Sequence, residues 1–301
     1  MQLTEQCGRC SPFQFDFIIM IYLIIGILFS SMLSILMRIS ESRTKYNLGL
    51  LAMNYISCTI VSAADTGFGN LFPAESGLGT AVLIGVLSGF VYLAGFALLQ
   101  FNISKNGVVL PATFMKLGLL VSVATSIIVF GERPQIVQII GFVIALAAIV
   151  LINSEKGDGT TKAEKGGFIW LIIMLICSGL GDTFAKVFEE VGNPSMNDHY
   201  LMFTFATACV LCLAMMVSKK QKIGKAEMLF GAMIGIPNYL SSKFLLKSLE
   251  FVDAVIAFPT YSVGCILVVT LVGLFVFKEK LSKKQLVSLG MIMVALAMLN
   301  L

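Results

Sequence analysis

The sequence predicts an all-α polytopic membrane protein in which ten transmembrane helices form two inverted five-helix repeats. Three observations support this fold class: the composition, the spacing of the apolar runs and an internal repeat. Of the 301 residues, 57% are hydrophobic and 13% are charged, and the mean hydropathy is +0.93. A soluble domain carries about 25% charged residues. This chain therefore has too few charges to cover a water-soluble surface, and a lipid bilayer is its expected environment.

Ten apolar runs follow one another along the chain. Each holds about 17–25 residues, which as a helix crosses a hydrocarbon core of about 30 Å. Backbone polar groups that face lipid need partners within their own segment, so every run is expected to be helical. The expected spans are 17–37, 48–64, 79–99, 108–130, 136–152, 167–187, 200–217, 228–249, 252–277 and 285–301.

Two stretches, 101–153 and 249–301, share one design: an apolar run with a proline, a charged turn and a second apolar run. From the glutamate of the turn onward, the two stretches align without a gap. The matched pairs are Pro111 and Pro259, Glu132 and Glu279, Gln138 and Gln285, and Asn153 and Asn300. A hydrophobic chain of two halves, with prolines at matching places in its spans, is typical of a transporter that binds its substrate at the repeat interface.

Paired glycines mark the two halves in the same way. Gly85 and Gly89 in the third span correspond to Gly231 and Gly235 in the eighth span. Small residues four apart let two helix backbones approach closely. We therefore expect both pairs to be helix-packing faces.

The chain divides at one clear boundary. A first five-helix repeat is expected over 17–153 and a second over 167–301, joined by the polar, glycine-rich linker 154–166. A polar tail, 1–16, precedes the first repeat. The gaps between apolar runs are too short for a further soluble domain of about 50 residues. Because both repeats are fused in one chain, a monomer is expected.

Loop charges predict the orientation. The odd-numbered loops hold fifteen Lys and Arg residues, whereas the even-numbered loops and both termini hold two, Arg9 and Arg133. The positive-inside rule then places both termini outside and the linker in the cytoplasm. Five spans per half give the halves opposite orientations. The expected location is the cell (plasma) membrane.

These features, with Gly131-Glu132-Arg133-Pro134 after the fourth span and Phe277-Lys278-Glu279-Lys280-Leu281 after the ninth, resemble the EamA-type branch of the drug/metabolite transporter superfamily. The resemblance covers essentially the whole chain. It implies a secondary carrier with a central cavity lined mainly by the first, third, fourth, sixth, eighth and ninth spans. It also implies a substrate among amino acids, sugars, nucleotide-sugars, phosphorylated metabolites or drugs.

One departure from the superfamily's pattern concerns the first span. The small multidrug-resistance relatives carry a membrane glutamate there, whereas this chain has Ser30, Ser31 and Ser34. Ser30 corresponds to Ser178 of the sixth span in the internal repeat. Cation efflux coupled to protons through a first-span carboxylate is therefore not expected.

Two ionisable residues inside spans are the leading site candidates, because each costs about 2.5–3.5 kcal/mol on insertion scales. Lys116 lies near the middle of the fourth span and could hold a substrate carboxylate or phosphate, or form a structural ion pair. Asp182 is the only acid deep inside a span. It could couple transport to protons or ions, pair with Lys116, or pair locally with Lys186 one turn on.

Polar and proline residues in other spans complete the expected substrate site. Pro259 and Tyr261 lie in the ninth span and Thr113 in the fourth. A proline frees a backbone carbonyl, which is tolerated where it lines a cavity. Asn238 in the eighth span and Tyr92 in the third supply hydrogen bonds and an aromatic wall. Each of these residues could equally serve helix packing alone.

The predicted function is alternating-access transport of a small polar or anionic metabolite, with no cofactor, metal or nucleic acid. No nucleotide-binding loop is present, so ATP is not expected to drive it directly. The alternative on the same scaffold is an exporter of drugs, lipids or hydrophobic cations. The string Gly179-Leu180-Gly181-Asp182 also matches that of intramembrane aspartyl proteases. Protease chemistry needs two carboxylates in one site, and the sequence offers no second aspartate deep in a span, so an enzyme is not expected.

Overall fold

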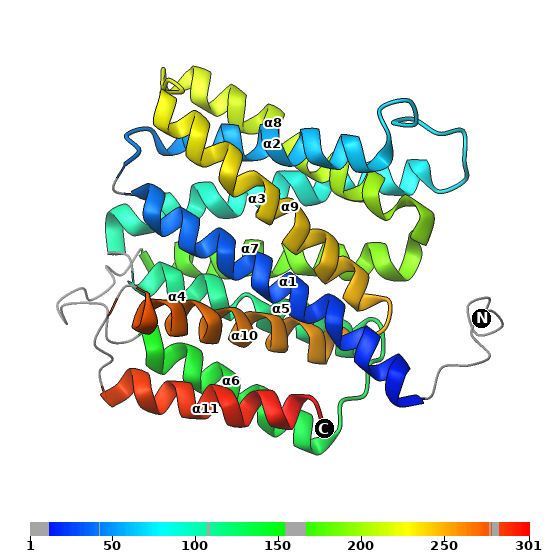
Figure 1. Cartoon of the computed structure of the whole chain (residues 1–301), viewed down its shortest axis with the longest axis vertical. Coiled ribbons are helices and arrows are strands. Elements are labelled where there is room, and N and C mark those ends of the chain that lie inside the picture. The colour runs from blue at the N-terminus through cyan, green and yellow to red at the C-terminus, as the bar shows by residue number, and fades with distance from the viewer. Residues whose placement is uncertain (1–11, 42, 107–108, 154–166, 277, 279–282) are drawn as a thin grey trace.

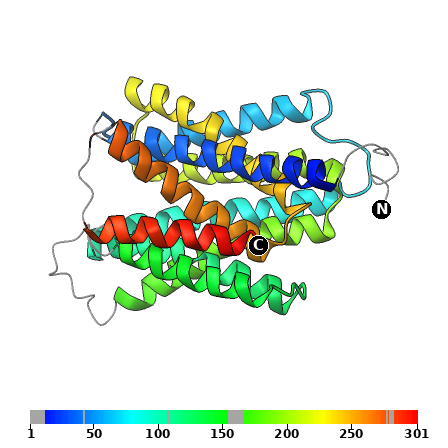
Figure 2. The same ribbon diagram turned by 60° about the horizontal axis from the view of Figure 1, so that its bottom comes forward.

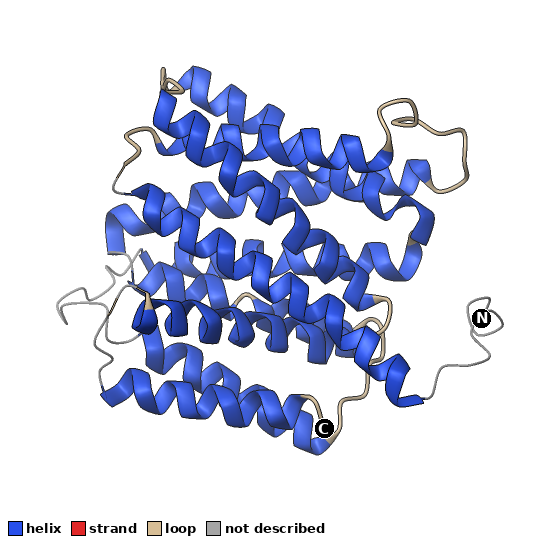
Figure 3. Ribbon diagram, viewed as in Figure 1, coloured by secondary structure: helices blue, strands red, loops and turns tan. Residues whose placement is uncertain are grey.

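The computed structural model describes residues 12–41, 43–106, 109–153, 167–276, 278 and 283–301. The linker 154–166, the first part of the predicted tail and the turn with Glu279 lie outside the described residues. Every regular element in the described part is helical (Figure 3). The α-helices are α1 (Pro12–Glu41), α2 (Asn47–Thr66), α3 (Leu78–Asn106), α4 (Val109–Leu117), α5 (Leu119–Ile128), α6 (Ile136–Asn153), α7 (Gly167–Val191), α8 (Asn197–Ser218), α9 (Lys225–Leu249), α10 (Ala254–Phe275) and α11 (Lys283–Leu299).

These helices correspond to the ten expected spans, because α4 and α5 together occupy the span expected at 108–130. Within the described residues, α1, α2, α3, α7, α8 and α10 are each long and apolar enough to cross a membrane. The segments Phe114–Ile128 and Ile136–Leu151 are shorter apolar helices. α1 begins at Pro12, five residues before the expected start of the first span. The prediction of an all-helical polytopic membrane protein is confirmed.

The interruption of the fourth span is not where the proline suggested. Pro111 lies in the first turn of α4, where a missing N–H costs no helical hydrogen bond. The helix is instead interrupted at Gly118, between α4 and α5. There the Gly118 N–H donates to the Met115 carbonyl at 3.2 Å, three residues back rather than four. In the ninth span Pro259 does lie inside a helix, and α10 continues through it.

The helices run roughly alongside one another, with α6 and α11 together at one edge and α2 and α8 toward the opposite edge (Figures 1 and 2). Two faces result. The terminal face carries the start of α1, the end of α11 and the turns 129–135 and 250–253. The basic face carries the loops 43–46 and 219–224, which hold five of the chain's Lys and Arg residues.

Most of the extensive helix contacts join the part of the chain before residue 153 to the part after residue 167. α1 packs on α9 and α10, and α2 packs on α8 and α9. α3 packs on α7 and α8, α5 on α7 and α10, and α6 on α11. The two parts of the chain therefore share their packing surfaces and do not form separate bundles.

Both glycine pairs lie at such contacts, which confirms their expected role in packing. On Gly85 a Cβ atom would lie 2.9 Å from the Tyr200 carbonyl of α8. On Gly235 it would lie 2.6 Å from the Asn54 carbonyl of α2. Gly89 and Gly231 leave equally little room. The α3–α8 and α9–α2 contacts are thus the same kind of close crossing.

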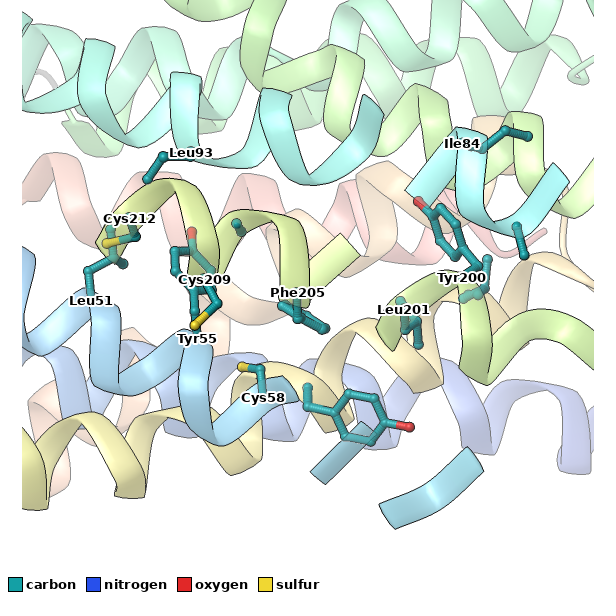
Figure 4. Close-up of a cluster of buried hydrophobic side chains, with 14 of the residues drawn as sticks. Leu51, Tyr55, Cys58, Ile84, Leu93, Tyr200, Leu201, Phe205, Cys209 and Cys212 are labelled. Atoms are coloured by element: carbon teal, nitrogen blue, oxygen red, sulfur yellow. The ribbon is translucent and has the colours of Figure 1, made fainter. Parts of the chain in front are cut away.

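The largest buried cluster lies among α2, α3, α7, α8 and α9. Leu51, Tyr55, Cys58, Phe205 and Cys212 belong to it, and Figure 4 shows their side chains directed toward one another. A second buried cluster joins α5, α6, α10 and α11. Elsewhere in the bundle α1 packs on α10, and α4 packs on α7.

The basic face is tied together by one buried carboxylate. Glu227, in the first turn of α9, accepts hydrogen bonds from the backbone N–H groups of Lys45 at 2.7 Å and Tyr46 at 3.1 Å. Burial alone would raise the pKa of Glu227, but these donors hold the pKa below its ordinary value. A carboxyl group whose pKa is lower in the folded protein than in the unfolded one stabilises the fold at pH values above its ordinary pKa of about 4.3. This contribution is lost as the pH falls through the pKa of the folded state.

We therefore expect Glu227→Gln to lower the free energy of unfolding at pH 7 by about 1–3 kcal/mol. We also expect the variant to lose less stability than the wild type between pH 7 and pH 3. Thermal unfolding of the purified protein across that pH range measures both effects. Glu75→Gln, at an exposed position of the terminal face, is the control. Parallel pH profiles for Glu227→Gln and the wild type would contradict the assignment.

Candidate functional site

The interruption in the fourth span fixes where Lys116 lies. The Ser178 hydroxyl of α7 donates to the Met115 carbonyl of α4 at 3.0 Å. Gly118 and Gly179 bring the two backbones together, since a Cβ on Gly118 would lie 2.9 Å from the Gly179 nitrogen. Lys116 follows Met115, and Asp182 lies one turn beyond Ser178. This crossing therefore places the cation and the anion on neighbouring helices, with Lys116 in the last turn of α4 and Asp182 inside α7.

Lys116 and Asp182 influence each other without forming an ion pair. The ammonium of Lys116 acts electrostatically on the Asp182 carboxylate. The described ion pairs, all within 4.0 Å, include neither side chain. Lys186 is engaged with Glu132, Glu189 and Glu190. The local Asp182–Lys186 pair that the sequence allowed is thus not formed.

Asp182 borders a small cavity of about 20 Å³ among α3, α7, α8 and α9. Its polar lining comes from Tyr92, Thr204, Ser242 and Tyr200 as well as Asp182. A cavity of this size holds about one water molecule when several polar groups surround it. Tyr92, one of the predicted residues, packs its ring edge against Phe205 and acts electrostatically on the same network.

Tyr261 faces the same region from α10. Its hydroxyl group lies beside Ser30 of α1 and Ser241 of α9. One turn further along α10, the Cys265 thiol lies 3.4 Å from the Ser30 hydroxyl. Pro259 is buried two residues before Tyr261. Its missing N–H leaves the Val255 carbonyl without a helical partner.

The remaining predicted residues take different positions. Asn238 is half-buried at the α2–α9 contact, where its side-chain amide donates to the side-chain oxygen Oδ1 of Asn54 at 3.2 Å. The side chain of Thr113 lies outside the described residues. Asn54 and Ser242 were not predicted as site residues. Ser242 shares the helix of Asn238, and only the packing of α9 against α7 places it at the cavity.

A larger cavity of about 280 Å³ lies toward the basic face, between α1, α2 and α3. Its lining includes Arg38, Glu41, Thr44, Asn47 and Asn54. Asn54 therefore contacts the cavity on one side and Asn238 on the other. The lining mixes charged and polar groups with apolar side chains such as Leu50 and Phe96.

Ion pairs cover the terminal side of Asp182. Lys243, which directly follows Ser242, contacts Asp65 of α2 at 2.5 Å and Asp198 of α8 at 2.9 Å. The Tyr239 hydroxyl donates to Asp65 at 2.8 Å. Lys243 therefore joins three helices, in addition to reaching the surface as a snorkelling residue would.

The bundle of apolar helices fits an integral membrane protein. Within the described residues Asp182 borders a small cavity, and neither Lys116 nor Asp182 takes part in an ion pair. Comparison with known proteins supports a transporter family. Residues 165–301 match the model of the EamA-like transporter family, so the second half of the chain is similar to EamA-type members of the drug/metabolite transporter superfamily. This family consists of membrane transporters rather than enzymes.

Two further similarities extend beyond the second half. An uncharacterized protein of Haemophilus influenzae is 23% identical over 271 residues, which cover 87% of this chain and 91% of the relative. A crystal structure of a protein superposes with a TM-score of 0.75 at 15% identity, covering 92% of this chain and 94% of the other. The superposition extends the fold similarity to nearly the whole chain.

Proposed function

We propose that the chain is a secondary active transporter that moves a small polar or anionic metabolite by alternating access. Its binding site would lie between two inverted repeats, at Lys116, Asp182, Tyr92 and Tyr261. Asn238, Thr113 and Pro259 would shape that site from the eighth, fourth and ninth spans. The observation that carries the proposal is the pair of opposite charges, Lys116 and Asp182, which interact electrostatically and belong to none of the ion pairs among the described residues.

The chemistry of the site favours a ligand with an anionic group. An ammonium group kept from a direct ion pair can hold a carboxylate or a phosphate, with the hydroxyl of Tyr261 as a further donor. Asp182 would contact a donor on the same molecule, either a hydroxyl or an ammonium group. A ligand that meets both charges also offsets the cost of keeping them away from bulk water.

The contacts between helices support the inverted repeat. If the two halves are copies of one unit, the equivalent helices are α1 and α7, α2 and α8, α3 and α9, the α4–α5 pair and α10, and α6 and α11. Under this equivalence the α1–α9 contact becomes α7–α3, and α2–α9 becomes α8–α3. The α1–α10 contact becomes α7–α5. Each of these contacts is present, as expected for two copies of one unit.

The orientation and the energy source belong to the same proposal. The terminal face would lie outside the cell, the basic face in the cytoplasm, and the protein would act as a monomer in the plasma membrane. Asp182, located beside the substrate site, would be the group through which protons or ions couple to transport.

Two other functions make different demands on the same residues. An exporter of drugs or lipids needs a roomy apolar cavity, whereas the cavity beside Asp182 is small and places the Asp182 carboxylate and several hydroxyl groups among its apolar side chains. An aspartyl protease needs a second carboxylate in the site. Among the described residues that line this cavity, Asp182 is the only carboxylate.

A thermal-shift panel on the purified protein tests the proposed substrate class. The probes are L-serine, succinate, glucose 6-phosphate, uridine and tetraphenylphosphonium, each at pH 6 and pH 8. A ligand at about 100 times its dissociation constant stabilises the fold by about 2.7 kcal/mol. We expect stabilisation by succinate, glucose 6-phosphate or serine. Stabilisation by tetraphenylphosphonium alone, dependent on Asp182, would replace this proposal with the exporter.

A further inference from the structure

Glu132, in the turn between α5 and α6, reaches across to the start of α10. One of its carboxylate oxygens accepts the Ala254 N–H at 3.0 Å, and the other accepts the Val255 N–H at 2.9 Å. These are among the N–H groups that a helix cannot satisfy by itself. Asp253 occupies the N-cap position of α10 but makes no capping hydrogen bond with its side chain. The cap of α10 is thus supplied by a residue more than a hundred positions earlier.

The turn is built to direct Glu132 inward. Gly131 has a φ of +72°, a backbone conformation that glycine adopts at little cost. The Glu132 N–H then donates to the Ser126 carbonyl at 3.2 Å, which closes the turn. As a result the Glu132 side chain is 8% exposed, although it lies at a face of the molecule.

Lys186 of α7 completes the contact. Its ammonium group lies 3.2 Å from Glu132 and 2.7 Å from each of Glu189 and Glu190. Lys186 therefore keeps two carboxylate partners on its own helix if Glu132 withdraws. Separation of α10 from α7 would leave no unpaired buried lysine, which makes this contact a reversible one.

The segment that Glu132 holds lacks one helical hydrogen bond to the rest of α10. Pro259 removes the hydrogen bond to the Val255 carbonyl, so Ala254–Phe258 is attached to the following turns by a weakened ladder. Directly after the proline, the Thr260 hydroxyl is buried without a hydrogen-bond partner among the described residues. Tyr261, a residue of the proposed site, comes next.

We infer that Glu132 is a positioning residue that holds the first turn of α10 against α7 and so closes the terminal side of the transport site. Release of this cap lets Ala254–Phe258 swing about Pro259 and opens a path toward Tyr261. The inference rests on the proposed transport function, because an opening matters only if a solute passes. It gives the Gly-Glu turn a role beyond that of a charged helix end.

Hydrogen–deuterium exchange of the full-length protein in nanodiscs tests the inference. In Glu132→Gln we expect the amides of Ala254–Phe258 to exchange about tenfold faster than in the wild type, because an ionised acceptor of two N–H groups is lost. Exchange in α8 and in α10 beyond Tyr261 should not change. Glu190→Gln is the matched control, because it removes a partner of Lys186 but no contact to α10. Its α10 amides should exchange as in the wild type.

Labelling of the native Cys265 gives a second readout, resolved by mass spectrometry in sealed vesicles. An impermeant maleimide applied at the terminal face should label Cys265 faster in Glu132→Gln than in Glu190→Gln. Unchanged labelling and exchange would overturn the inference, and so would a uniform rise in exchange over all helices. Neither readout involves a transported solute, so failure to find a substrate would count against the proposed function and leave this test intact.

Discussion

Replacement of Lys116 by glutamine is expected to weaken the binding of an anionic ligand about 100-fold. The variant keeps a polar side chain, one bond shorter than lysine, but removes a charge-assisted hydrogen bond, which contributes about 1.5–3 kcal/mol. At a concentration that stabilises the wild type by about 2.7 kcal/mol, the variant should gain only about 0.4 kcal/mol. Thermal shift with whichever of succinate or glucose 6-phosphate stabilises the wild type measures the loss.

Lys219→Gln is the matched control, because Lys219 is exposed at the basic face. It should leave the ligand-induced shift unchanged. Asp182→Asn should reduce the shift for serine more than for succinate, since only serine carries an ammonium group. If Lys116→Gln keeps the full ligand-induced shift, Lys116 is not part of the binding site.

The second large effect concerns the close crossing of α3 and α8. An added methyl group at Gly89 would overlap the Thr204 carbonyl and lie 2.8 Å from the Thr207 Cβ. Relief of this overlap requires the two helices to separate, and overpacking of this kind costs about 1–3 kcal/mol. We therefore expect Gly89→Ala to lower the midpoint of thermal unfolding by several degrees, although alanine is the better helix former.

Gly95, in the same helix, provides the control. A Cβ there meets nothing within 4 Å, so Gly95→Ala should be neutral or slightly stabilising. Gly235→Ala should repeat the loss at the α9–α2 crossing, where the added atom would lie 2.5 Å from the Ser57 Cβ. Equal stability of Gly89→Ala and Gly95→Ala would show that the α3–α8 crossing is looser than the structure indicates.

The spans were predictable because each depends only on its own residues. A run of about 20 apolar residues must cross the membrane as a helix whatever surrounds it. The break at Gly118 was not predictable on this basis. It depends on Gly179 and Ser178, which lie sixty residues away in sequence and meet it only through packing. Pro111 was the obvious local signal, but its position in the first turn of α4 makes it harmless.

The sequence was enough to predict which charged residues belong to the candidate site, but not which charges form ion pairs with each other. A lysine and an aspartate inside apolar spans are costly in any membrane protein, so Lys116 and Asp182 stood out from sequence alone. Which charges pair could not be deduced, because Lys186 had Asp182 one turn away and yet binds Glu132 from a distant turn. Only tertiary packing separates those two arrangements.

Counterflow in proteoliposomes tests the central claim most directly. Vesicles containing the purified protein are preloaded with the unlabelled stabilising probe, and the same probe, radiolabelled, is added outside without ATP. Alternating access predicts transient accumulation of label in wild-type vesicles, with little accumulation in Lys116→Gln vesicles and the wild-type level in Lys219→Gln vesicles. Equal, slow entry of label into wild-type and protein-free vesicles, despite binding of the probe to the purified protein, would contradict the proposal that this chain is a carrier.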